Sequence, residues 1–193
     1  MTMNFRNTLM LAIAPVALGL AACSGTDTAN DDGDLTTQED TARTLATLMA
    51  GNGDLSSVSQ AMRDTGLSTM LDGPSSYTLI APTNDALSAV EGLDEVIDDQ
   101  KNAPVVAAIL REHIIPGALT PETIGEAIDD KGGAVTMRTL GEGTITFDKD
   151  GADGAIVMKT SDGVEARVAS APMVGSNGVL IPVDHLLASL PAA

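Results

Sequence analysis

Few side chains in this sequence could perform catalysis or bind a metal ion. Its 193 residues include two histidines, His113 and His185, and one cysteine, Cys23. Asp184 precedes His185 and could orient it as a base, but no G-x-S-x-G motif offers a nucleophile. Zinc sites need several nitrogen or sulfur ligands, which two isolated histidines do not supply. We therefore expect a protein that is not an enzyme and uses no cofactor or metal, with a hydrolase as the weaker alternative.

An acidic stretch, DKDGADG at 148–154, invites comparison with a calcium-binding loop. Counted from Asp148, however, Ala152 takes a ligand position and Asp153 takes the place of the required glycine. Lys159 stands where the bidentate glutamate belongs. A hairpin turn with surface carboxylates is therefore the preferred interpretation, and weak cation binding is the alternative.

The charge of the chain restricts its partners. From Cys23 onward there are 9 basic and 27 acidic side chains, a net charge of −18. Such a surface repels nucleic-acid phosphates and anionic lipid headgroups. We therefore expect no nucleic-acid partner. The charge suits a solvated surface in a saline exterior, or a basic partner.

The N-terminus is typical of an export signal. Residues 1–22 carry Arg6 and no acidic side chain, and the apolar stretch 9–20 is too short to span a membrane. The sequence LAAC at 20–23 resembles the lipobox of bacterial lipoproteins. The resemblance implies cleavage before Cys23, a diacylglycerol (typically palmitate-rich) on its thiol and usually N-acylation. The membrane would then be the first partner, through the lipid on Cys23.

An acidic segment, 23–40, separates the anchor from the folded part. Residues 24–40 contain six acidic side chains, no base and little apolar material. Such a composition cannot form a core, so we expect a disordered tether. Ser24 follows the cysteine where an aspartate would indicate inner-membrane retention. The outer membrane or cell surface is therefore favoured, and the periplasmic face is the alternative.

From residue 41 onward, apolar residues recur first at helical spacing. Asp54 is placed to cap a helix that Gly66 stops, Thr83 caps another, and Pro104 opens a third. His113 lies on the apolar side of that third helix, where a hydrogen-bonded core histidine is expected rather than a base or ligand. The helices are expected near 45–49, 54–66, 83–90 and 104–113, with another starting at 120.

Strand signals dominate the second half. Tyr77–Ala81 is predicted to be a short apolar strand. After Gly133, apolar residues recur at every second position, which is typical of strands. Asp150-Gly151, Asp162-Gly163 and Asn177-Gly178 are turn pairs of the hairpin type. Helices first and strands second predict an α+β fold in one domain over 41–190. The later strands are expected at 135–137, 145–147, 156–158, 164–168 and 179–181.

Three blocks in this region resemble the signatures of the fasciclin domain, in the family's order. They are YTLIAPTNDA at 77–86, LREHIIPG at 110–117 and SNGVLIPVDHLL at 176–187. The resemblance implies a wedge of two β-sheets with a cluster of short helices alongside. The residues that carry it are Ala81, Pro82, Thr83, Asn84, Asp85, His113, Pro116, Gly117, Asn177, Gly178 and Asp184.

The sequence also departs from the family pattern. Glu112 stands where the family usually has tyrosine, and Ile181 and Pro182 replace a histidine and an apolar residue. The Tyr-His pair is linked to integrin-type adhesion in animal members, and only His113 of that pair is present. This weakens any transfer of receptor-binding chemistry.

Folding roles account for several motif residues. Thr83 caps a helix, Asn84 or Asp85 complements its dipole, and Asp184 is expected to cap a last short helix. Asn177 and Gly178 are expected to supply two positive-φ positions of a tight hairpin. We place these roles ahead of a binding role.

Taken with the resemblance, the sequence predicts an exported, lipid-anchored, non-enzymatic protein that mediates cell adhesion or cell-surface and matrix contacts. Its partner would be a surface or matrix protein or a glycan. The alternative is a module that binds a small ligand or envelope component, which a deep apolar pocket would favour. A hydrolase is the least supported interpretation.

Overall fold

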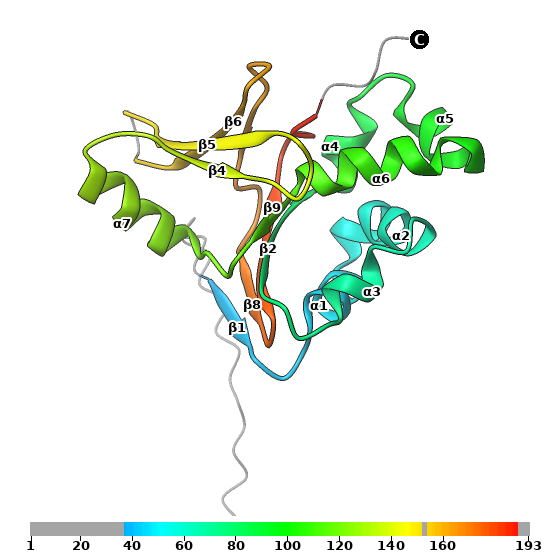
Figure 1. The fold of residues 1–193 in the computed structure, drawn as a ribbon, viewed down its shortest axis with the longest axis horizontal. Helices are drawn as coiled ribbons and strands as arrows, with labels where there is room; N and C mark the ends of the chain where they lie inside the picture. Colours follow the sequence, from blue (N-terminus) through cyan, green and yellow to red (C-terminus); the bar gives the residue numbers. More distant parts are fainter. Residues whose placement is uncertain (1–36, 152–153, 189–193) are drawn as a thin grey trace, which may run out of the picture. The chain divides into compact units, whose positions relative to one another are not determined.

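Figure 1 shows a computed structural model of the chain, which describes residues 37–151 and 154–188. The chain divides into two units, and every described residue belongs to the second, Asp34–Ala193. The export signal at 1–22, Cys23 and most of the expected tether lie outside the described residues. Their interpretation therefore stays a prediction.

The described residues form short helices and two β-sheets, so the expected α+β fold is confirmed (Figure 1). The helices are α1 (Leu45–Gly51), α2 (Ser56–Asp64), α3 (Ser68–Leu71), α4 (Asn84–Ser88), α5 (Leu93–Asp98), α6 (Ala103–Glu112) and α7 (Pro121–Lys131), with 3₁₀ turns η1 (Gly53–Leu55) and η2 (Gln100–Asn102). The strands are β1 (Gln38–Asp40), β2 (Tyr77–Pro82), β3 (Ile114–Pro116), β4 (Val135–Arg138), β5 (Thr144–Lys149), β6 (Ile156–Thr160), β7 (Glu165–Arg167), β8 (Met173–Gly175) and β9 (Gly178–Val183).

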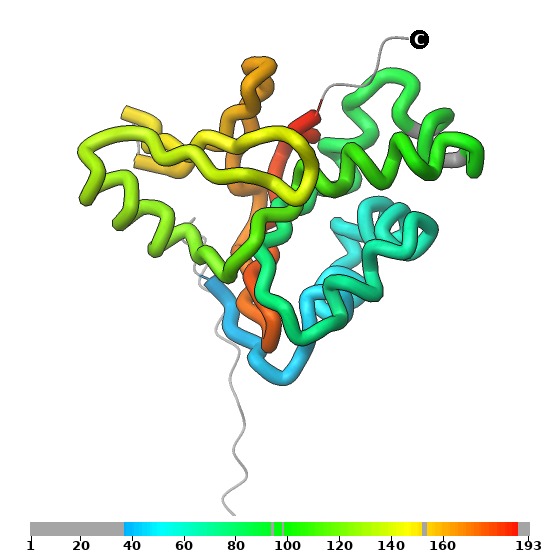
Figure 2. Tube along the Cα trace, in the orientation of Figure 1, coloured from blue at the N-terminus to red at the C-terminus, as the bar shows by residue number. Residues whose placement is uncertain are grey.

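The first sheet is mixed and has the order β1-β8-β9-β2-β3. Its central strands β2 and β9 run parallel, as do β1 and β8, and the other neighbours are antiparallel. The second sheet, β4-β5-β6-β7, is antiparallel throughout. Figure 2 shows the earliest described strand lying beside a late one, because β1 adds to the edge of the sheet at β8.

Side chains of β2 alternate between two hydrophobic cores, which explains its uninterrupted apolar sequence. Leu79 and Ala81 pack among helices α1 to α6, in one core. Ile80 points to the other core, where Phe147 of the second sheet and Ile124 of α7 are fully buried. The central sheet is thus covered on both faces, by the helix cluster and by the second sheet with α7.

Several helix boundaries follow from local signals. The Thr83 side chain accepts from the N–H of Ala86 at the start of α4. The Thr120 side chain accepts from the N–H of Thr123 at the start of α7. α7 ends at Lys131, and the next residue, Gly132, caps it in the left-handed conformation with φ +70°. The expected cap at Asp54 is wrong: Asn52 caps the 3₁₀ turn η1, and α2 begins without a side-chain cap.

The first sheet begins three residues before the expected domain boundary at 41. Gln38–Asp40 is β1, and the N–H of Gln38 donates to the carbonyl of Pro172 at 2.7 Å. The Thr37 hydroxyl donates to the carboxylate of Glu122 at 2.8 Å. These partners lie far along the sequence, so the polar composition of the segment gave no sign of a strand.

The three Asx-Gly pairs take up different turns from those expected. Gly175 pairs with Gly178, so the two-residue loop is Ser176-Asn177, and Gly178 is the first residue of β9. The loops at 150–155 and 161–164 are longer than a two-residue hairpin. Gly163 nevertheless has φ +84° in the loop after β6, a left-handed conformation that favours glycine.

Candidate functional site

His113 follows α6 and is fully buried, with both ring nitrogens engaged by the backbone. Nδ1 lies 2.9 Å from the carbonyl oxygen of Ile109, and Nε2 accepts from the N–H of Leu187 at 3.0 Å. Nδ1 therefore carries the proton, because a carbonyl oxygen can only accept. Burial lowers the pKa of His113, against smaller raising effects of the Ile109 carbonyl and of Glu112. His113 is thus a neutral connector that ties the C-terminal segment to α6.

Stability should depend on pH through His113. Its pKa is lower in the folded than in the unfolded chain, so its stabilising effect is complete above the unfolded value of about 6.5 and declines as pH falls below it. We expect His113→Ala to lower the free energy of unfolding by about 1–3 kcal/mol near pH 7.5, because polar partners lose their bonds. Near pH 5 the difference from wild type should be smaller, because the wild type then has to keep a histidine neutral.

Denaturant unfolding of both proteins at the two pH values measures this. His185→Ala is the matched control, since His185 is an exposed histidine paired with Asp184. An effect of His113→Ala that does not change with pH would contradict the buried neutral imidazole. If the variant instead unfolds like wild type and loses binding to a partner, His113 belongs to a functional site.

Asn84, in the first block, joins two helical segments. Its Oδ1 accepts from the N–H of Ser57 at 3.0 Å, and its Nδ2 donates to the carbonyl of Gly53 at 2.9 Å. Ala81 and Pro82 of the same block are buried in β2. Asp85 lies in the first turn of α4, where a carboxylate complements the helix dipole.

The second block ends at the edge of the first sheet. Pro116 pairs with Tyr77, and Gly117 has φ +100°, a conformation that favours glycine. The N–H of Gly117 donates to the carbonyl of Ser76, and its own carbonyl accepts from the hydroxyl of Thr78 at 2.7 Å. These residues terminate β3 and contact the neighbouring strand.

The third block fixes the β8–β9 hairpin and the connection between the sheets. The Asp184 carboxylate accepts from the N–H of Arg167 at 2.7 Å and lies 2.9 Å from Nδ1 of His185. Burial acts to raise the pKa of Asp184, but the Arg167 N–H and His185 outweigh it, and the net effect is a lowered pKa. No helix follows in the described residues up to 188, so the expected cap at Asp184 is wrong.

Glu112, noted above only as a departure from the family pattern, holds the loop between β4 and β5. Its carboxylate accepts from the Thr139 hydroxyl at 2.6 Å, from the N–H of Glu142 at 2.8 Å and from the N–H of Gly143 at 3.1 and 3.2 Å. A Cβ atom added at Gly141 or Gly143 would overlap this carboxylate. The two glycines in that loop were the sequence signal for such a close approach.

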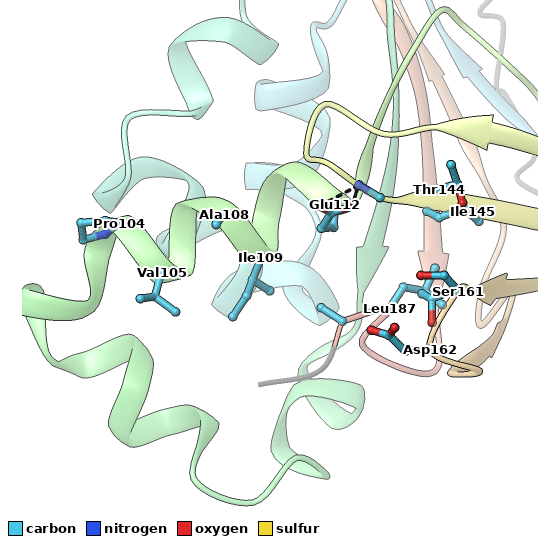
Figure 3. Close-up of a pocket in the computed structure, with 13 residues that line it drawn as sticks. Pro104, Val105, Ala108, Ile109, Glu112, Thr144, Ile145, Ser161, Asp162 and Leu187 are labelled. Atoms are coloured by element: carbon cyan, nitrogen blue, oxygen red, sulfur yellow. Dashed lines mark hydrogen bonds between the residues drawn. The ribbon is translucent and has the colours of Figure 1, made fainter. Parts of the chain in front are cut away.

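Beside Glu112 lies an open cleft of about 570 Å³ (Figure 3). One wall is α6, which contributes Val105, Ala108 and Ile109. The opposite side is formed by β5, the turn after β6 and the C-terminal segment, with Ile145 and Leu187. The cleft is therefore mainly aliphatic, and it was not foreseen because its walls come from segments far apart in the sequence.

Neither histidine is placed as a base in the cleft. His113 has both ring nitrogens occupied, and the side chain of His185 is 63% exposed outside the cleft. Among the described residues, no three His, Cys, Asp or Glu side chains are grouped to hold a metal ion. Within the same part of the chain, no helix has the length and apolar character needed to cross a membrane.

Comparison with known proteins places this geometry in a family. The model of the fasciclin domain matches residues 53–189. Protein sll1483 of Synechocystis sp. is 28% identical over 151 residues, 77% of this chain and 74% of that protein. The transforming growth factor-beta-induced protein ig-h3 of Sus scrofa is 30% identical over 129 residues, 66% of this chain but only 16% of that protein.

A solved structure has the same fold. It is a FAS1 domain pair from the insect cell adhesion molecule fasciclin I, with a TM-score of 0.63 over 77% of this chain and 52% of that chain, at 14% identity. The fasciclin family is linked to cell adhesion in eukaryotes, and its domains are generally non-catalytic. The chain belongs to the fasciclin domain family.

Proposed function

We propose that this chain is an exported, lipid-anchored, non-catalytic contact protein that joins its membrane to a cell-surface or matrix partner. The observation that carries the proposal is the open aliphatic cleft beside α6 in a fasciclin domain, at which a partner can bury apolar surface. The two histidines, occupied or remote from the cleft, offer it no general base. Adhesion by the insect fasciclin I named above supports the same kind of role.

Anchoring rests on the LAAC sequence at 20–23. Two or three acyl chains hold a protein stably at a bilayer, at about 0.8 kcal/mol for each buried methylene group. Replacing Cys23 with serine should move the protein from the detergent-extracted membrane fraction to the soluble fraction, or stop its processing. Cell fractionation measures this, with Ser24→Ala as the control that keeps the anchor. Unchanged membrane partition of Cys23→Ser would rule out the lipoprotein.

Contact through the cleft is tested with the mature chain carrying serine in place of Cys23, on envelopes isolated from the host. Ala108 is exposed on α6 and lines the cleft, so Ala108→Trp should fill it without disturbing the core. We expect retention to fall at least about fivefold, because the partner loses its apolar site. Ala50→Trp, at an exposed position of α1 outside the cleft, is the matched control and should be retained like wild type. Equal retention of both variants would remove the cleft from the proposed function.

A second function is supported by the size of the cleft. Its volume of about 570 Å³ lies within the roughly 300–1,000 Å³ typical of small-molecule sites. A small apolar envelope component could then be the ligand. Native mass spectrometry of protein purified from the host distinguishes the two: a bound small molecule that Ala108→Trp expels favours ligand binding over adhesion.

A further inference from the structure

The cleft has a charge pattern as well as an aliphatic floor. Its lining contains two carboxylates, Glu112 on α6 and Asp162 on the turn after β6, and no lysine or arginine. Figure 3 shows Asp162 on the side of the cleft that faces α6, next to Leu187. An apolar floor is thus bordered by negative charge from two separate elements.

Glu112 is held in place so that its charge stays in the cleft wall. Its donors within the described chain are a hydroxyl and two backbone N–H groups, all neutral. A carboxylate has about four acceptor positions, and the N–H of Gly143 is shared between both oxygens. Acceptor capacity therefore remains for a donor that enters the cleft. A fixed carboxylate binds a cation without the entropic cost of ordering a flexible side chain.

The net charge of the whole chain also favours a positively charged partner. The chain from Cys23 onward carries a net charge of −18, which raises the local concentration of positively charged groups and speeds their association. An acidic or phosphorylated partner would instead meet repulsion both at long range and at the border of the cleft. Charge complementarity thus selects the class of partner, and the aliphatic floor selects the part of it that is buried.

We propose that the cleft binds a protein segment in which a large apolar side chain stands next to a lysine or arginine. The apolar side chain packs between Val105, Ile109 and Leu187, and the ammonium or guanidinium group lies against the Glu112 and Asp162 carboxylates. This inference names the partner chemistry of the site in the proposed function and rests on that function. It does not require a divalent cation.

The test uses three blocked hexapeptides as probes, titrated into the mature chain with serine in place of Cys23 and followed by amide chemical shifts. Ac-GLKLKG-NH₂ combines apolar and basic residues, Ac-GLELEG-NH₂ keeps the apolar ones, and Ac-GSKSKG-NH₂ keeps only the charge. We expect the first to bind at least about tenfold more tightly than either other peptide at low salt, with shifts at the residues of the cleft. The preference over the acidic peptide should shrink as added salt screens the charges.

Two charge reversals locate the effect. Asp162→Lys should weaken binding of the apolar and basic peptide at least about fivefold, because a like charge then borders the cleft. Asp130→Lys makes the same change at an exposed position near the end of α7, outside the cleft, and should leave binding within about twofold. Asp162 lies in an exposed turn and has an interaction of its own, so the unfolding temperature of both variants is measured to separate weaker binding from weaker folding.

Several results would overturn the inference. They are equal binding of the apolar peptides irrespective of charge, shifts outside the cleft, binding of the charged peptide without apolar residues, or no binding of any peptide. Equal binding of both apolar peptides, combined with loss of envelope retention in Ala108→Trp, refutes the partner chemistry and leaves the proposed function in place. Selective binding of the basic peptide, with envelope retention that Ala108→Trp does not change, removes the cleft from the proposed function and leaves the chemistry of the cleft in place.

Discussion

Replacing Gly178 with alanine is expected to lower the free energy of unfolding by more than about 4 kcal/mol and to leave little folded protein at 37 °C. Gly178 opens β9 directly opposite Tyr77 of β2 and has φ +151°. An added Cβ would overlap the carbonyl oxygen of Tyr77 and come within 2.9 Å of Leu45 Cδ1. The carbonyl belongs to the backbone of the central sheet, so it cannot move aside without separating the two strands.

Denaturant unfolding followed by circular dichroism measures this effect. Gly133→Ala is the matched control, because a Cβ there meets nothing within 4 Å and the backbone is not left-handed. It should change stability by less than about 1 kcal/mol. If Gly178→Ala unfolds at the same denaturant concentration as Gly133→Ala, the close packing of β2 against β9 is wrong.

Asn177→Ala is expected to have the second largest effect, a loss of about 3–4 kcal/mol. Asn177 is 5% exposed, and its side chain makes three hydrogen bonds to backbone groups that are distant in sequence. Its Oδ1 accepts from the N–H of Leu45 at 2.8 Å, and its Nδ2 donates to the carbonyls of Leu71 and Gly73 at 2.7 and 2.8 Å. Removing it leaves a buried donor and two acceptors without partners, each of which costs about 1 kcal/mol or more.

Asn177→Asp is expected to make the stability depend on pH, which Asn177→Ala would not do. Its carboxylate still accepts from Leu45 but faces the two carbonyl oxygens, so the folded chain raises the pKa of the introduced group. Relative to Asn177→Ala, this variant should gain stability as pH falls toward about 4, because the protonated group can donate again. Parallel unfolding curves across pH test this. The same pH profile for both variants would contradict the hydrogen-bonded arrangement.

Asn177 and Gly178 also explain why this block resembles the family signature, although neither of these two residues lines the cleft. The hairpin loop orients the amide toward the first turn of α1 and the end of α3, and the glycine lets β9 approach β2. Both roles concern folding. The block therefore predicts the fold reliably but gives little information about the partner.

Glu112, by contrast, gives information about the partner rather than about the family. It departs from the family's usual tyrosine, so resemblance to animal adhesion members carries no information about it. In this chain it binds the loop of Thr139 and Gly143 and borders the cleft. This fixed carboxylate is the physical basis of the proposed basic partner.

Prediction from sequence succeeded where a few neighbouring residues determine the structure. The buried strand Tyr77–Pro82, the capped start of α4 at Thr83 and the core position of His113 all follow from local pattern and side-chain chemistry. The same holds for α6 and for the alternating strand β5. The order of these elements was enough to identify an α+β fold.

It failed for short segments whose state depends on distant partners. β1, β3 and β8 have three residues each, too few to show a period, and the sequence of β1 is entirely polar. A strand of this length gains its hydrogen bonds only when a neighbouring strand presents an edge. The short helices α3 and α5 are likewise stabilised by packing against the helix cluster rather than by their own sequences.

The sequence by itself therefore determined the fold class, the family blocks, the buried histidine and the acidic net charge. Only the tertiary structure decided that His113 accepts from Leu187, that Glu112 binds a loop about 30 residues further along the chain, and that Glu112 and Leu187 line one cleft. The reason is physical. Periodicity and capping act over a few residues of chain, whereas a cleft and its charges are set by how helices and sheets pack, which depends on contacts between residues far apart in sequence.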